Sequence, residues 1–411
     1  MSIRILFSTM RRRPMMPLLV LLQVAVACAI LCNVLFLTWR QLAPMLAPSG
    51  IDGDNLILVD QLSPAHDEWP AAQVRAGAEA MREVPGVRSV SAAIGLPLMV
   101  GGMLNIARLQ AHSGAKVNVT VYAGHDLAQT LGVQLVKGRY FLPDEYRVWG
   151  SGQGKGTLEP IIITESLAHR LFGEGNALGR VLRNPGDRTG GGYQVVGIVN
   201  HLLTAFARGA TPATVDNTIL KPESVGKTPY LSYAVRVDPG MRAEALRGVR
   251  RAIARKFGPL LAVGSKGRAR FYNTIRNGFF SSSRAALWLL ASVSVVVLVV
   301  TMIGIMGLTG FWIQRRTRSI GIRRALGARR VDILKYFQAE NALVVAIGIV
   351  AGMLLAYFGN ALLMRYYELP RLPLWYLPVG AVVMLVLGQL AVLAPALRAA
   401  AVPPVVATRS I

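Results

Sequence analysis

Hydrophobic positions are distributed in two different ways along the chain. Four runs contain no Asp, Glu, Lys or Arg: residues 15–38, 285–313, 341–364 and 372–397. Because a helix needs about 20 mainly apolar residues to cross a bilayer, each run is long enough to span a membrane. Between the first and second runs, apolar and polar residues alternate over short distances, as in strands and amphipathic helices. The pattern predicts an α-helical membrane protein with four transmembrane helices and a large α+β extracytoplasmic domain inserted between the first and the second.

Basic residues orient these predicted spans. Residues 1–14 contain several arginines and no acidic residue, so we expect them in the cytoplasm. Residues 314–340 then form a cytoplasmic coupling loop and helix, residues 365–371 an outer loop, and residues 398–411 a cytoplasmic tail. The first run exceeds the roughly 7–15 apolar residues of a signal peptide, which favours a span over a cleaved signal.

Residues 39–284 are predicted to form the outer domain. A strand–helix–strand order occurs twice, with strands expected at residues 55–60, 87–94, 231–237 and 260–263 and helices at 69–83 and 241–257. These two units predict one lobe, made from residues 53–100 and 230–270. Residues 101–229 are expected to form an inserted lobe, with strands at 116–122, 160–164 and 193–199 and a helix at 165–172 capped by Thr164. Residues 271–284 are expected to form a stalk helix that acts as a lever or as a spacer.

Charge adds little to this picture. The chain has 411 residues, of which 53% are hydrophobic and 16% charged, and a formal net charge of +24; soluble domains have about 25% charged residues. Residues 41–284 have 28 Lys or Arg against 18 Asp or Glu, so the outer domain is mildly basic. No basic face interleaved with aromatic residues is evident, so nucleic acid is not an expected partner. Both cysteines, Cys28 and Cys32, lie in the first run, and the outer domain therefore has no disulfide.

Catalytic and metal-binding motifs are not found in the sequence. The five histidines have no metal-ligand spacing, and the hydrolase motifs G-x-S-x-G and H-E-x-x-H are missing. The adjacent Asp144 and Glu145 fit a solvated turn after Pro143. The P-loop pattern G-x-x-x-x-G-K-[ST] does not occur, because Lys221 stands where its first glycine would precede Gly226. We therefore expect a non-catalytic chain with no cofactor and no metal of its own.

The predicted spans contain no acidic or basic residue, whereas ion-coupled carriers normally keep such residues in the membrane. Their uncharged polar residues include Gln23, Asn33, Asn341 and Gln389, which are typical of hydrogen bonds between helices. Gly304, Gly307 and Gly310 recur at every third position, and Gly348 and Gly352 form a GxxxG pattern. These glycines permit close helix packing, within the chain or between two chains.

The densest charge of the chain lies between the second and third runs. Seven arginines occur from Arg315 to Arg330. Near a membrane surface each basic residue contributes about 1 kcal/mol of attraction to anionic lipids, so one interpretation is simple anchoring. The ordered small and apolar residues of the segment favour a second interpretation, docking onto a partner. The candidate docking residues are Arg318, Ile320, Gly321, Ile322, Arg323, Arg324, Ala325, Leu326, Gly327 and Ala328.

A family resemblance strengthens the docking interpretation. The stretch RTRSIGIRRALGARRVDIL (316–334) resembles the cytoplasmic loop of FtsX/MacB-like permeases of ABC transporters, which commonly reads R-x-R-E-I-G-I-R-R-A-L-G-A. The stretches LGVQLVKGRYFLPDE (131–145), PIIITESLAHRLFGEGNALGRVL (160–182) and YQVVGIV (193–199) resemble the MacB-type periplasmic core domain. APALRAAAVPPVVATRS (394–410) resembles the family's C-terminal tail. The matches occur in family order, with one departure, since Ser319 replaces the usual acidic residue.

The resemblance implies a mechanism called mechanotransmission. Two permease chains, identical or different, pair in the bacterial inner membrane above separate ABC ATPase subunits that hold ATP and Mg. The ATPase is expected on another chain, because this one begins at the first span. ATP-driven motion would reach the periplasmic domain and export a substrate from the periplasm or outer leaflet, with a periplasmic adaptor and an outer-membrane channel as further partners. The alternatives are an FtsX-like signalling permease that controls a cell-wall hydrolase or sensor, and a lipoprotein-releasing permease.

Overall fold

The computed structural model describes residues 15–98, 105–111, 114–150, 156–185, 191–208, 210–211, 213–316, 320–322, 326–367 and 372–401. The chain divides into two compact units. One, the helical unit, comprises Met1–Gln41 and Arg284–Ile411, and the other, the outer domain, comprises Leu42–Ser283. The sheet-rich unit is thus inserted between the first and second long helices, as the sequence predicts.

Four helices are long and apolar enough to cross a membrane. They are α2 (Met15–Leu46), α8 (Ser281–Arg315), α10 (Arg330–Tyr367) and α11 (Tyr376–Ala401). Each helix extends beyond its charge-free run at one or both ends, because flanking polar residues continue the helical hydrogen bonds outside the apolar segment. The four-span class predicted from hydropathy is confirmed.

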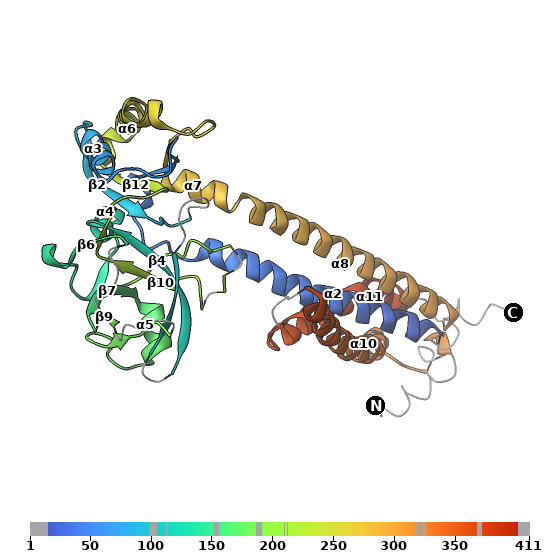
Figure 1. The fold of residues 1–411 in the computed structure, drawn as a ribbon. Coiled ribbons are helices and arrows are strands. Elements are labelled where there is room, and N and C mark those ends of the chain that lie inside the picture. Colours follow the sequence, from blue (N-terminus) through green and yellow to red (C-terminus); the bar gives the residue numbers. More distant parts are fainter. Residues whose placement is uncertain are drawn as a thin grey trace. The chain divides into compact units, whose positions relative to one another are not determined.

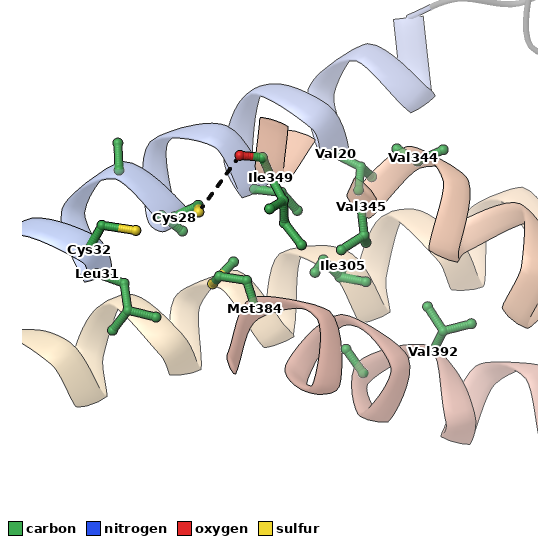
Figure 2. Close-up of a cluster of buried hydrophobic side chains, with 14 of the residues drawn as sticks. Val20, Cys28, Leu31, Cys32, Ile305, Val344, Val345, Ile349, Met384 and Val392 are labelled. Carbon is green, nitrogen blue, oxygen red and sulfur yellow. Dashed lines mark hydrogen bonds between the residues drawn. The ribbon is translucent and has the colours of Figure 1, made fainter. Parts of the chain in front are cut away.

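The first of these helices, α2, is the most buried of the four. Val24, Cys28 and Cys32 of α2 are fully buried in an apolar cluster that includes Val345 and Met384 from α10 and α11 (Figure 2). The Cys28 thiol lies 3.9 Å from the carbonyl oxygen of Ile349. In contrast, much of the apolar surface of α8 is exposed in the single chain.

Two of the four glutamine and asparagine side chains singled out from the sequence join different helices, as their type predicts. Gln23 of α2 donates a hydrogen bond of 3.1 Å to the carbonyl of Val300 in α8. Asn341 of α10 donates one of 3.0 Å to the carbonyl of Gly388 in α11. For Asn33 the prediction is wrong, because its amide donates to the carbonyl of Ala29 in its own helix.

The outer domain is built on one mixed sheet with the strand order β13-β1-β12-β2-β4-β10-β7-β9-β5, in which β3 also pairs with β4 and β8 with β9. Figure 1 labels β12, β2, β4, β10, β7 and β9 of this sheet. The strands are β1 (Leu56–Leu62), β2 (Val87–Ile94), β3 (Asn105–Gln110), β4 (Lys116–Gly124), β5 (Leu135–Gly138), β7 (Leu158–Thr164), β8 (Val181–Leu182), β9 (Gly192–Val199), β10 (Thr218–Lys221), β12 (Leu231–Val237) and β13 (Arg268–Phe271). A separate two-stranded ladder pairs β6 (Arg147–Val148) with β11 (Glu223–Ser224). The two predicted lobes therefore share a sheet, joined where β2 meets β4.

Helices cover this sheet on both faces. The helices are α3 (Ala71–Arg82), α4 (Leu127–Leu131), α5 (Glu165–Phe172), α6 (Arg242–Phe257) and α7 (Tyr272–Phe279). Side chains of β1 alternate between the two faces: Ile57 and Val59 pack in a cluster with α3 and α6. Leu56 and Leu58 pack in another cluster with α4 and α7. Period-two alternation along the strand thus separates the outer domain into two apolar layers.

Three local predictions are wrong. Residues 260–263 are not a strand: Gly258–Leu260 is a 3-10 turn, and the edge strand is β13. The predicted stalk is not one helix, since α7 ends at Phe279 and α8 begins at Ser281. Thr164 precedes α5 but does not cap it with its side chain, because its hydroxyl donates to the carbonyl of Asp216.

Candidate functional site

The candidate coupling segment lies between the end of α8 at Arg315 and the start of α10 at Arg330. Within it, residues 320–322 are helical, and the amide of Ile320 donates 3.0 Å to the carbonyl of Arg316. Ile320 is 5% exposed and packs with Ile333 and Phe337 of α10. The segment is therefore fixed to the helical unit through this isoleucine.

Other apolar residues of the coupling segment point outward. Ile322 is 49% exposed and Leu326 is 83% exposed. Gly327 has φ +95°, a left-handed conformation that favours glycine, and it turns the chain towards α10. Leu326 and Ile322 therefore expose apolar surface on the outward side of the segment in the single chain.

The structure places six of the ten predicted docking residues. These are Ile320, Gly321, Ile322, Leu326, Gly327 and Ala328. The four others, Arg318, Arg323, Arg324 and Ala325, lie outside the described residues. Within the described part, the burial of Ile320 and the exposure of Leu326 separate the segment into an inward side and an outward side.

A buried ion pair braces this segment, and the sequence analysis did not anticipate it. Arg316 Nη1 lies 3.1 Å from Glu340 Oε1 and 3.2 Å from Glu340 Oε2. The Glu340 side chain is 2% exposed and that of Arg316 is 23% exposed. The guanidinium also lies 4.6 Å from the centroid of Trp312. The pair joins the end of α8 to α10 across the coupling segment. Its sequence signal was an acidic residue immediately before the third charge-free run.

Glycines from three helices lie against α2. A Cβ added at Gly348 would stand 3.1 Å from the carbonyl oxygen of Leu21, and one at Gly352 would stand 2.6 Å from that of Ala25. On α8, Gly304 lies against the side chain of Gln23. On α11, a Cβ at Gly380 would come within 2.4 Å of the Cys32 sulfur. These positions permit the close approach of α2 to its neighbours.

Gly307 and Gly310 differ from those glycines. A Cβ added at either one meets no described atom within 4 Å. Both therefore lie on an open face of α8 in the single chain.

In the outer domain, the G-R-x-F stretch at Gly138–Phe141 forms a local clamp. Arg139 binds the carboxylate of Glu145 with two hydrogen bonds, of 2.8 and 2.6 Å. Glu145 also accepts a hydrogen bond from the amide of Leu142 at 2.8 Å. These hydrogen bonds from Arg139 lower the pKa of Glu145. The turn at Asp144 and Glu145 is therefore structural, because the pairing of Arg139 with Glu145 holds it to the end of β5.

Histidines form no metal site among the described residues. His201 instead pairs with Asp216, with 2.7 Å between Nδ1 and Oδ2. Burial raises the pKa of Asp216, although His201 opposes this effect. The pair closes a loop beside β10, and its role is structural.

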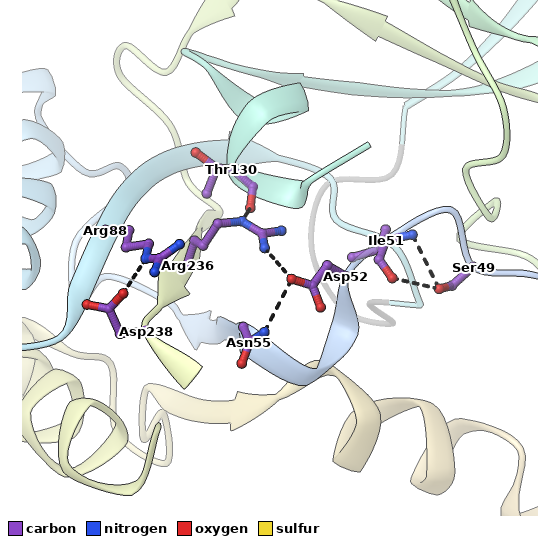
Figure 3. A network of polar contacts seen from close by, with 8 residues as sticks. All are labelled: Ser49, Ile51, Asp52, Asn55, Arg88, Thr130, Arg236 and Asp238. Carbon is purple, nitrogen blue, oxygen red and sulfur yellow. Dashed lines mark hydrogen bonds and ion pairs between the residues drawn. The ribbon is translucent and has the colours of Figure 1, made fainter. Parts of the chain in front are cut away.

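The chain that leaves α2 is held to the sheet by a polar network (Figure 3). Arg236 of β12 donates 2.8 Å to Asp52 Oδ2 and 2.8 Å to the carbonyl of Thr130 at the end of α4. Asn55 donates to the same carboxylate at 3.3 Å. Ser49 forms a turn by hydrogen bonding to the backbone of Ile51. The linker between α2 and β1 is thus attached to the domain core.

Four apolar helices with an α+β domain inserted after the first define a polytopic membrane protein with a large extracytoplasmic domain. Residues 20–252 match the model of the MacB-like periplasmic core domain, which covers more than half of the chain. Residues 291–404 match the FtsX-like permease C-terminal model. The chain belongs to the MacB/FtsX-like permease family of ABC transporters, and the resemblance inferred from its motifs is confirmed.

Individual relatives match parts of this chain. It is 29% identical over 248 residues to the macrolide export ATP-binding/permease protein MacB of Chromobacterium violaceum, covering 59% of this chain and 35% of that protein. It is 24% identical over 249 residues to the uncharacterized ABC transporter permease YknZ of Bacillus subtilis, covering 60% and 61% respectively. The crystal structure of the periplasmic region of MacB from Actinobacillus actinomycetemcomitans aligns with a TM-score of 0.36 and 14% identity, covering 56% of this chain and 94% of that one. The chain thus spans less than two thirds of the length of either full-length relative.

Proposed function

We propose that this chain is the permease subunit of a MacB-like ABC transporter. It couples ATP hydrolysis by a separate ATPase subunit to a conformational change of the periplasmic domain, which exports a substrate from the periplasm or the outer leaflet. Membership of the permease family supports this function. Two features of the sequence also support it. The predicted spans contain no charged residue, which disfavours an ion gradient as the energy source. The sequence contains no P-loop, which favours ATP hydrolysis by another subunit.

The observation that carries the proposal is the outward side of the coupling segment. Leu326 exposes 83% of its surface beside the left-handed Gly327, while Ile320 fixes the same segment to the helical unit. A docking element needs both properties, an apolar contact for the partner and a rigid attachment to the helices that must move. Burying a leucine contributes about 1.5–3 kcal/mol, enough for a specific contact.

The same proposal assigns the partners and the location. Two permease chains pair in the inner membrane of a bacterial cell, with both termini in the cytoplasm and the outer domain in the periplasm. ATP and Mg bind the ATPase subunits, and this chain holds no cofactor. A periplasmic adaptor and an outer-membrane channel complete the export path, since the large outer domain offers a docking surface.

The test is Leu326→Glu in the complex purified with its ATPase. A carboxylate in an apolar contact loses the leucine contribution, so we expect co-purification of the ATPase to fall about tenfold or more. Leu326 is a cleaner target than Gly327, because any side chain at φ +95° strains the backbone.

The matched control is Leu374→Glu, because Leu374 is also strongly exposed, at 66%, but precedes α11 on the opposite side of the predicted topology. The control should retain the ATPase at the wild-type level. Equal retention of the ATPase by both variants would refute docking through Leu326.

A further inference from the structure

The last turn of α2 is capped by an arginine from a distant part of the sequence. Arg276 Nη2 donates 3.0 Å to the carbonyl of Met45 and 2.8 Å to the carbonyl of Ala47. Carbonyl groups at the end of a helix have no intrahelical partner, and a cation is favourable there because of the helix dipole. A residue close to them in the sequence could satisfy the same carbonyls. Here the cap comes from α7, the helix that directly precedes α8.

The helix that carries Arg276 is itself fixed in the outer domain. Tyr272, Ile275 and Phe279 of α7 are buried in the cluster that also contains Leu202 and Leu203. An apolar anchor of this kind resists sliding of α7 along the sheet, because each side chain fills a packed site.

Arg208 holds the C-terminal end of α7. Its guanidinium lies 4.7 Å from the centroid of the Phe279 ring and donates to the Phe279 carbonyl. After α7, only Phe280 separates this helix from α8, and Phe280 is 3% exposed. The break between the two helices is therefore buried at Phe280 and held on its α7 side.

The chain beyond α2 is equally constrained. Gly50 has φ +71°, and a Cβ there would stand 1.7 Å from the carbonyl oxygen of His201. Only glycine permits such an approach of two backbones. Two residues later, Asp52 binds Arg236 of the sheet (Figure 3). Residues 47–55 are therefore a rigid connection and not a loose tether.

We propose that Arg276 is the positioning residue of a transmission joint, in which it holds the end of α2 to α7 so that movements of α2 and α8 enter the outer domain together. The role of the joint in transmission rests on the proposed function. The contacts that form the joint do not depend on that function, and all of them lie within the outer domain, residues 42–283. Without the Arg276 contacts, α2 would end in carbonyls exposed to water, and its movement would be separated from that of α7.

The first test uses the full chain in lipid nanodiscs without the ATPase. Arg276→Met removes both hydrogen bonds while keeping much of the apolar side chain, so amide exchange at residues 47–55 should become at least about tenfold faster. Arg276→Lys keeps the charge and one hydrogen bond, so its exchange rate should lie between those of the wild type and Arg276→Met. Arg251→Met, at an exposed arginine of α6, is the control. Unchanged exchange in Arg276→Met would overturn the joint.

The second test adds the co-purifying ATPase. Nitroxide labels at Glu79→Cys and Glu174→Cys, in a background with Cys28 and Cys32 replaced by Ala, report the ATP-dependent distance change within the outer domain. Arg276→Met should abolish this change while ATP turnover stays within about twofold of the parent, an outcome that loss of folding would not produce. A preserved change would overturn the coupling role.

A cross-link provides the rescue. Joining Ala47→Cys to Arg276→Cys with a short bis-maleimide, while the spin labels at positions 79 and 174 are carried on ketone-bearing residues that maleimide does not modify, should restore the distance change in the same nanodiscs. Failure of the linked protein to respond would count against the joint. If the parent complex shows no ATP-dependent change while Arg276→Met still accelerates exchange, the proposed function fails and the joint stands.

Discussion

The ion pair between Arg316 and Glu340 gives the sharpest quantitative prediction. The contact joins α8 to α10 beside the coupling segment, with 3.1 Å between Nη1 and Oε1. The informative perturbation is a double-mutant cycle that replaces each residue by methionine, singly and together. Methionine keeps an unbranched apolar side chain, so the packing around the pair changes less than the charge does.

The magnitude follows from the burial of the two side chains. At 3.1 Å the direct attraction is about 5 kcal/mol with an effective dielectric constant near 20, and most of it offsets the cost of desolvation. Removing one partner of a buried pair costs about 3–5 kcal/mol. Since Arg316 is 23% exposed, we expect about 2–4 kcal/mol for Arg316→Met and about 1 kcal/mol for Glu340→Met, after which the arginine can extend to water.

The double variant should recover most of that loss, because well-packed apolar pairs often replace buried ion pairs at little cost. The assay is the free energy of unfolding in mixed micelles titrated with SDS. Arg315→Met is the control, since among the described residues the Arg315 guanidinium stacks on Phe311 at 4.5 Å and forms no ion pair. If the two single effects simply add in the double variant, the pair contributes no interaction energy and the bracing role is refuted.

Two further changes test other contacts. Gly352→Val should lower the melting temperature in detergent and cost about 1–3 kcal/mol, because its Cβ would meet the carbonyl of Ala25 at 2.6 Å. Gly307→Val, on the open face of α8, should leave the melting temperature of the single chain unchanged. Arg139→Met should cost about 1–2 kcal/mol at pH 7, since it removes two charged hydrogen bonds from Glu145. The pKa of Glu145 is lowered in the folded state, so this stabilisation is present above the ordinary value of 4.5 and is lost as the pH falls through the folded value. If the difference in unfolding free energy between the wild type and Arg139→Met does not shrink as the pH falls, this account is contradicted.

The membrane spans and the regular elements were predictable because their signals are local. Charge-free runs of more than about 20 residues leave few alternatives to spanning helices. Strands such as β2 and β12 have the same bounds as predicted, since period-two alternation holds along their whole length. The edge strand β13 was missed because Arg268 and Arg270 make it look like a loop, yet Arg270 donates 2.7 Å to the buried carboxylate of Asp60 on β1.

Pairings between distant residues were not predictable. Nothing near Arg276 in the sequence indicates that its partners are the carbonyls of Met45 in α2 and of Ala47 directly after that helix. The same holds for Arg236, whose partner Asp52 is 184 positions away. Side-chain type indicates that an arginine needs an anionic or carbonyl partner, whereas only the fold decides which one is near.

A basic residue beside a membrane span can contact lipid headgroups, a partner protein or its own chain, and composition does not separate these cases. The described ends of the coupling segment do separate them. Arg316 contacts Glu340 and Trp312 and therefore braces the chain, whereas Leu326 extends outward. In the proposed function, docking pushes on the segment and the ion pair carries that push into α10, so loss of either should uncouple the ATPase. Only loss of bracing should also weaken the fold, and this difference distinguishes the two roles by experiment.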